Sequence, residues 1–166
     1  MYYTIKDNIK NLSWESIFCG IEKELLSPDI AVEYANYSAE NSLEVSAEII
    51  ELMILDIAEK DIVLSIISNF APKTKKCLNN CLRKLRYVIL LELWQAENDK
   101  RKLSSILDKV YADFDYPSEM DSFVSYMPVK DEYDVSLHSE EENIAHLIKN
   151  FESFMQSEKE WLLSEN

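Results

Sequence analysis

The chain has 166 residues, about the size of one domain, and 47% of them are apolar, which is enough for a real core and argues against disorder. Its formal charge of -14 argues against binding to nucleic acid or to an anionic membrane, because both carry charge of the same sign. We therefore predict no direct contact with either, and a cationic partner is the natural complement.

The cysteines and the N-terminal segment indicate the cellular compartment. A secreted disulfide framework needs more cysteines and an even number of them, whereas this chain has Cys19, Cys77 and Cys81. The first residues lack the basic patch and apolar stretch of a signal peptide, and no run approaches the roughly 18 apolar residues of a membrane span. We expect a cytoplasmic protein, and we interpret Cys77 and Cys81 as buried thiols on one helical face rather than half of a zinc site.

Gly20 is the only glycine in the chain, which bears directly on the fold class. Tight hairpins and bulges ordinarily need glycine for positive φ angles, so a sheet is disfavoured. Apolar residues instead recur at the three- and four-residue spacing of amphipathic helices. The sequence predicts an all-α fold, a single domain over residues 1–166 built as an irregular bundle of six to eight helices.

Four helices are expected in the first half of the chain. The first begins after Ser13, and the second begins near Pro28, where proline suits the first helical position. The third is expected after Ser42, and its apolar band is too wide for a surface helix, which predicts a central position. The fourth covers Asp61 to Phe70 and ends before Pro72. The band of the third helix consists of Leu43, Val45, Ile49, Ile50, Met53, Ile54 and Ile57.

The second half begins with a long helix predicted from Lys73 to about Asn98, although the stretch LRYVILLELW inside it could alone form a buried strand. Asp99 is expected to cap the next helix. Glu119 to Met127 should make about two turns, and Val129 to His138 reads as a loop. Ser139 and Glu142 have the spacing of a capping box, which predicts the start of the last helix.

Charge is distributed unevenly along the chain. Residues 73–86 hold six basic side chains and no acid, whereas residues 111–142 hold ten acids and one lysine. The two regions could neutralise each other across a helix interface, or the acidic one could bind a partner. We favour the acidic region as the interaction candidate, because the field of the whole protein opposes binding of nucleic acid by the basic one.

Acids alternate with aromatic side chains in the stretch from Tyr111 to Pro128, YADFDYPSEMDSFVSYMP. We expect Phe114, Phe123 and Met127 to face inward and the acids to face outward. Exposed carboxylates beside flat rings suit a basic protein, because the rings supply the desolvated anchors that charge alone does not. The predicted partner-binding residues are Asp113, Asp115, Tyr116, Glu119, Asp121, Asp131, Glu132, Tyr133, Asp134, Glu140, Glu141 and Glu142.

No catalytic, cofactor-binding or metal-binding set stands out in the sequence. Asp113 and Asp115 begin like a calcium loop, but Pro117 and the missing glycine break the pattern. His138 lies beside three glutamates and is interpreted as a solvated loop residue, because no motif places a serine or cysteine nucleophile with it. We predict that the chain is not an enzyme and needs no cofactor. A metal-dependent enzyme using Asp113, Asp115 and Glu119 is a minor alternative.

Three stretches carry a resemblance: Ser13-Trp14, SPDIAVEYA at residues 27–35 and VYADFDYPSEMDSFVSYMP at residues 110–128. Together they are similar to a bacterial family known as domain of unknown function 2247. The family pattern leads us to expect a basic residue in place of Ser125. Members resemble small helical proteins encoded near polymorphic toxin systems, such as those of contact-dependent growth inhibition, which implies an immunity role.

Charge and resemblance together predict the function. A nuclease toxin must be cationic to hold phosphates, so an inhibitor gains by presenting carboxylates to its active site. We expect an immunity protein that binds a cognate basic toxin domain, a nuclease, as a monomer in a 1:1 complex and occludes its active site. The alternative is a helical protein-interaction adaptor that inhibits nothing.

Overall fold

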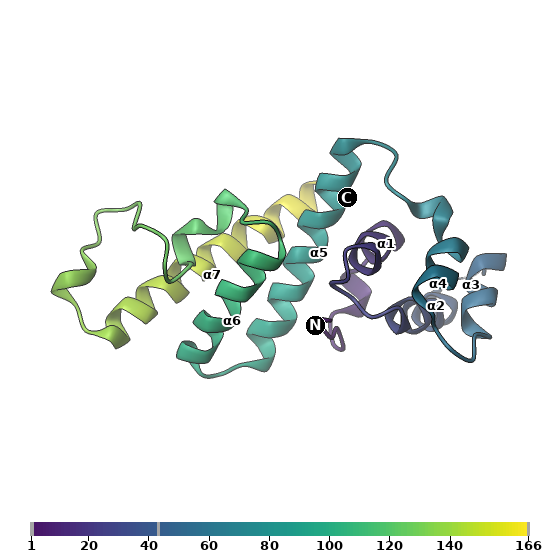
Figure 1. The fold of residues 1–166 in the computed structure, drawn as a ribbon, viewed down its shortest axis with the longest axis horizontal. Coiled ribbons are helices and arrows are strands. Elements are labelled where there is room, and N and C mark those ends of the chain that lie inside the picture. The colour runs from purple at the N-terminus through teal and green to yellow at the C-terminus, as the bar shows by residue number, and fades with distance from the viewer. Residues whose placement is uncertain (1, 43, 166) are drawn as a thin grey trace. The chain divides into compact units, whose positions relative to one another are not determined.

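The computed structural model describes residues 2–42 and 44–165, which form seven α-helices joined by turns and 3₁₀ helices (Figure 1). Within these ranges no β-strand is present, and the one pairing of extended backbone is an isolated parallel bridge between Tyr3 and Leu26. The all-α prediction is confirmed. Leu43, part of the predicted apolar band, lies outside the described residues.

The chain divides into two compact units, one ending at Ile89 and the other beginning at Leu90. The boundary falls inside α5 (Lys75–Ala96), which occupies most of the range predicted for a long helix. The strand alternative for LRYVILLELW is therefore wrong. The single-domain description of residues 1–166 stays a prediction.

The N-terminal unit contains η1 (Ile9–Asn11), α1 (Trp14–Glu22), α2 (Asp29–Asn41), α3 (Ala47–Met53), α4 (Lys60–Ile66), η2 (Ser68–Phe70) and the first part of α5. Helix α1 begins after Ser13 as expected, and Ser13 caps it, because its side chain accepts a hydrogen bond from the Ser16 N–H while the Ser16 hydroxyl accepts one from the Ser13 N–H. The fully buried side chains of this unit include Ile17, Ile21, Leu26, Leu52, Ile67, Leu85 and Ile89.

Gly20 allows close packing of α1 and is not part of a turn. It lies inside α1, where a Cβ atom would come 2.7 Å from Leu26 Cδ1 and 3.1 Å from Leu85 Cδ2. Those separations are shorter than ordinary van der Waals contact, so a larger residue would push against two buried leucines. The absence of a side chain here lets α1 approach its neighbours closely.

Helix α3 differs from its prediction. Ser42 lies at the C-terminal end of α2, and the Ile49 N–H of α3 donates to the Ser46 hydroxyl at 3.4 Å, so the cap is Ser46. The helix has seven residues and buries only Leu52. The prediction that this helix is central is wrong. A helix of about two turns packs only one narrow face against the core of the unit, so its other apolar side chains are not buried.

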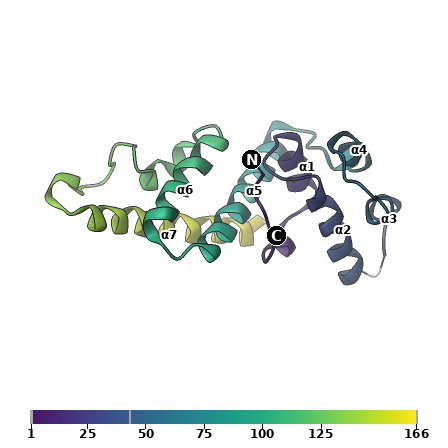
Figure 2. The ribbon, with the colours of Figure 1, turned by 60° about the horizontal axis from the view of Figure 1, so that its bottom comes forward.

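The C-terminal unit contains the end of α5, α6 (Lys100–Asp113), η3 (Ser118–Phe123), η4 (Val135–Leu137) and α7 (Glu140–Glu165) (Figure 2). Helix α7 packs on both α6 and η3. Asp99 caps α6 by accepting from the N–H groups of Arg101 and Lys102, and the Ser139–Glu142 capping box opens α7, both as predicted. The core includes Leu107, Val110, Met120, Phe123, Ile148, Phe151 and Met155.

Two smaller predictions are corrected by the structure. The helix expected over Asp61 to Phe70 is interrupted at Ile67, which separates α4 from η2. The expected pair of buried thiols is wrong at Cys77, which is exposed, while Cys81 is half-buried. Cys19 is the buried thiol, and burial raises its pKa to about 12.

No described helix is both long and apolar enough to cross a bilayer.

Candidate protein-binding site

The end of α6 forms a strained turn. Asp115 and Tyr116 follow it with φ angles of 61° and 58°, the left-handed region that bulky residues rarely adopt. The turn is closed by the Tyr116 N–H, which donates to the Tyr111 carbonyl at 2.9 Å, and Pro117 then leads into η3. Backbone strain of this kind costs on the order of 1–3 kcal/mol per residue and persists only where the surroundings hold it.

The strained turn places charged and aromatic groups at the surface. The Tyr116 side chain is 62% exposed, and its ring meets the buried Tyr111 ring edge-on at 5.4 Å. Tyr126, 58% exposed, meets the same ring at 6.1 Å. We call the exposed predicted residues here the turn group; they are Asp113, Asp115, Tyr116 and Glu119.

Asp121 lies inside the unit, so the expectation that the acids of this stretch face outward is wrong at this position. Its side chain is 9% exposed and accepts hydrogen bonds from the Tyr111 hydroxyl at 2.7 Å and from Lys130 Nζ at 2.6 Å. The hydrogen bond from Lys130 lowers the pKa of the Asp121 carboxyl most, and the hydrogen bond from Tyr111 lowers it further. The bond between Tyr111 and Asp121 also raises the pKa of the Tyr111 hydroxyl to about 12. Asp121 therefore fastens η3 to α6 and to the following loop.

The loop expected at residues 129–138 is ordered by a stack of three rings. Tyr133 lies between the chain's two histidines, with ring centroids 4.5 Å from His138 and 3.8 Å from His146. Its hydroxyl donates to Asn143 Oδ1 at 3.0 Å, and the Asn143 amide donates to the Val135 carbonyl at 3.1 Å. His138 is thus packed on Tyr133 rather than simply solvated, and the loop, which contains η4, is fixed to the start of α7.

Two acids of this loop and one in the first turn of α7 are held in place by hydrogen bonds. Asp131 accepts from the Tyr133 N–H at 3.1 Å and lies 2.9 Å from His146 Nε2. Asp134 accepts from the Ser136 N–H and hydroxyl, and Glu142 accepts from the Ser139 N–H. These donors hold the pKa of each of the three carboxyl groups below its usual range.

The remaining predicted acids complete what we call the loop group. Glu140 and Glu141 lie within 2.7 Å and 3.5 Å of the Arg101 guanidinium, an exposed arrangement that contributes little stability. Glu132 is exposed between Asp131 and Tyr133. The exposed predicted residues thus fall into two groups, and Asp121, which is buried, belongs to neither. The loop group is Asp131, Glu132, Tyr133, Asp134, Glu140, Glu141 and Glu142.

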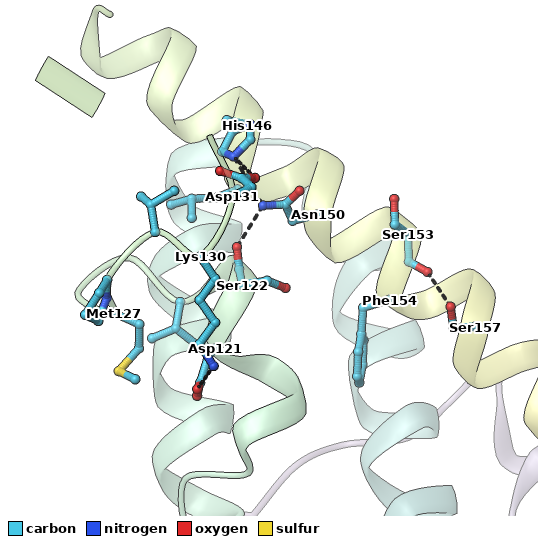
Figure 3. Close-up of a pocket in the computed structure, with 14 residues that line it drawn as sticks. Asp121, Ser122, Met127, Lys130, Asp131, His146, Asn150, Ser153, Phe154 and Ser157 are labelled. Carbon is cyan, nitrogen blue, oxygen red and sulfur yellow. Dashed lines mark hydrogen bonds and ion pairs between the residues drawn. The ribbon is translucent and has the colours of Figure 1, made fainter. Parts of the chain in front are cut away.

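A pocket of about 350 Å³ opens between this loop and α7 (Figure 3). Its apolar lining includes Val124, Leu147 and Phe154, and its polar lining includes Asp131 and Asn150. The Asn150 amide donates to the Ser122 carbonyl at 2.9 Å, which joins α7 to η3 beside the opening. Such a pocket can receive one long side chain from another molecule, with its apolar part inside and a positive end near Asp131.

Sequence reasoning missed the residues that shape this pocket. His146, Asn150 and Lys130 are polar residues without a local motif, and their partners lie up to 28 positions away. The spacing of His146 and Asn150, four residues apart on a predicted helix, was the available signal. Among the described residues, no group of three or more histidine, cysteine, aspartate or glutamate side chains could hold a metal ion.

The comparisons with known proteins give a family for the chain. The model of the family described as "Uncharacterized protein conserved in bacteria (DUF2247)" matches residues 2–159. Neither a curated protein nor a solved structure matches the sequence or the fold. The match covers nearly the whole chain, so this all-α protein belongs to the bacterial domain of unknown function 2247 family.

Proposed function

We propose that the chain is an immunity protein that binds a cognate bacterial toxin domain in the cytoplasm and neutralises it. The partner is a basic nuclease domain, and the inhibitor covers its active site in a 1:1 complex. The observation that supports this most directly is the loop group, in which six carboxylates accompany Tyr133 and ring stacking and hydrogen bonds fix Tyr133, Asp131, Asp134 and Glu142.

Fixed geometry favours binding because a preorganised surface loses little conformational entropy when a partner docks. In the loop group, Asp131 and Asp134 are held by backbone donors, and Tyr133 is held between two imidazole rings. Carboxylates in such a frame can replace the phosphates that a nuclease site is built to hold. Negative charge also steers a cationic partner toward the surface, which raises the association rate at low salt.

The pocket beside the loop supplies the apolar component of the proposed interface. Charges at the rim of an interface contribute mainly to specificity and association rate, whereas buried anchors carry most of the affinity. An arginine or lysine of the toxin could place its methylene groups against Leu147 and Phe154 and its charge beside Asp131. In this arrangement Lys130 would keep its ion pair with Asp121.

Co-expression with toxin domains tests the proposal. Cells that produce the toxin domain encoded next to this gene should grow normally when they also produce the wild-type chain, and unrelated toxins should kill them. Binding without protection would favour the adaptor alternative. Failure to protect against every toxin domain encoded nearby would contradict the immunity function.

A pocket variant makes the test specific to the site. Leu147→Arg places a positive charge in the pocket lining, so protection should fall if the toxin inserts a basic side chain there. The matched control is Leu163→Arg on the same helix, where the side chain is already 69% exposed. Equal protection by the two variants would place the interface elsewhere.

A further inference from the structure

A second surface, in the N-terminal unit, exposes large apolar side chains. Ile54 is 74% exposed, Ile57 71% and Ile50 52%, and Met53 and Ile62 are also exposed. We call these five residues the isoleucine edge. They fall within 13 consecutive positions that cover the second half of α3, the turn after it and the start of α4. Exposed apolar side chains are ordinary when scattered singly, but a concentration of this kind indicates an interaction surface.

The geometry of α3 explains why these residues face water. Leu52 is the buried residue of the helix, and successive side chains on an α-helix are rotated by about 100°. Ile50 and Ile54, the residue that caps the helix, therefore lie on the side opposite Leu52, and Met53 lies beside Ile50 at the three-residue spacing of neighbours on one face. The apolar face is a direct consequence of which residue the unit buries.

Acidic residues alternate along the chain with those of the isoleucine edge. Residues 44–61 hold six acids and a single basic residue, Lys60. Lys60 Nζ donates to Glu24 Oε1 at 2.8 Å and to the Glu22 carbonyl at 3.2 Å, so its charge is directed toward the end of α1. The pKa of Glu48 is held below its usual range by its own backbone N–H and by Ser46. The acids are Glu44, Glu48, Glu51, Asp56, Glu59 and Asp61.

We propose that the isoleucine edge docks a cationic amphipathic helix of a partner protein. Such a helix presents an apolar stripe flanked by lysine and arginine, which matches apolar side chains bordered by carboxylates. A second copy of this chain would bring like charges together, and an anionic membrane would be repelled. The inference does not depend on the immunity function, because it concerns different residues of the other unit.

A synthetic peptide provides the direct test. The probe is a fluorescein-labelled peptide of leucine and lysine with leucines at helical spacing, and its control has the same composition in scrambled order. Fluorescence anisotropy with the full chain should show tighter binding of the amphipathic peptide. The double substitution Ile54→Ser with Ile57→Ser should weaken that binding at least about tenfold, a change of about 1.4 kcal/mol, because it removes two apolar side chains from the contact.

Two matched variants separate apolar contact from charge. Leu163→Ser removes an equally exposed apolar side chain from α7 and should leave peptide binding unchanged. Glu51→Lys with Asp56→Lys should weaken binding and reduce its dependence on salt. Both substituted positions of this pair are exposed, so the fold should persist, which circular dichroism checks.

Four outcomes would overturn the inference. Equal binding of the scrambled peptide, or of the Ile54→Ser and Ile57→Ser variant, would show that charge alone attracts the probe. A dimer in sedimentation equilibrium that this variant abolishes would make a second copy the occupant. Stronger binding to vesicles of phosphatidylcholine and phosphatidylglycerol than to the peptide, lost in the same variant, would make the occupant a lipid surface.

Discussion

Residues 47–57 and residues 111–123 make opposite use of their side chains. The first segment is rich in isoleucine, yet it buries Leu52 and leaves Ile50, Ile54 and Ile57 exposed. The second is rich in acids, yet it supplies fully buried Met120 and Phe123 to the core of its unit. Apolar content alone therefore does not decide burial. A segment enters the core when its turns direct side chains toward neighbouring elements.

The largest effect is expected at the core of the acidic segment. Phe123 is fully buried, with ring centroids 5.3 Å from Phe151 and 5.0 Å from Phe154. Phe123→Ala should lower the free energy of unfolding by about 3–5 kcal/mol, because it removes buried apolar surface and leaves a cavity. Urea unfolding followed by circular dichroism measures this. Tyr126→Ala, at an exposed ring nearby, should cost far less, and equal losses would contradict the assigned core.

The fold class and several helix ends could be predicted from the sequence because their causes are local. One glycine, helical spacing and the caps at Ser13, Asp99 and Ser139 act within a few residues. The position of α3 could not be predicted, because Ser46 rather than Ser42 sets its start and tertiary packing selects Leu52 for burial.

The candidate site could be predicted in its chemistry but not in its geometry. The sequence identifies a region dense in acids and aromatics, and most of the predicted residues are exposed. The burial of Asp121 depends on Lys130, nine positions later, and the stack around Tyr133 depends on His146 in α7. Such contacts between separate elements leave no periodic signal in a single sequence.

The N-terminal unit contains a tightly packed position that contrasts with its exposed edge. Gly20→Ala should destabilise the protein by about 1–2 kcal/mol, because overpacking against Leu26 and Leu85 costs roughly 1–3 kcal/mol and the better helix propensity of alanine offsets up to about 1 kcal/mol. Thermal or urea unfolding measures the change. In a Leu26→Ala background the cost should disappear, and a cost that persists there would contradict the proposed clash.

Asp121→Asn tests the buried anchor of the acidic segment through pH. The native Asp121 pKa is lowered, so its stabilising effect is present above the unfolded pKa of about 4 and is lost as pH falls through the native pKa. The variant should be less stable than wild type at neutral pH, and the difference should narrow below about pH 4. Unfolding measured across this range is the check, and a pH-independent difference would argue against the ion pair with Lys130.

The smallest effect is expected at the isoleucine edge. Ile54→Ser should change the free energy of unfolding by no more than about 0.5 kcal/mol, because the side chain is already 74% exposed and loses little buried surface. Urea unfolding alongside Phe123→Ala gives the comparison under one set of conditions. A loss approaching that of Phe123→Ala would show that Ile54 is buried in solution and would remove the contrast between the two segments.

The most direct test of the immunity proposal is the association rate of the purified chain with the toxin domain encoded beside its gene, followed by stopped flow at increasing salt. Wild type should associate more slowly as salt rises, and Glu132→Lys in the loop group should lower the rate and flatten that dependence. Glu33→Lys, the same charge change at an exposed position of α2, should behave nearly like wild type. A rate insensitive to salt and equal in all three proteins would contradict capture through the loop group.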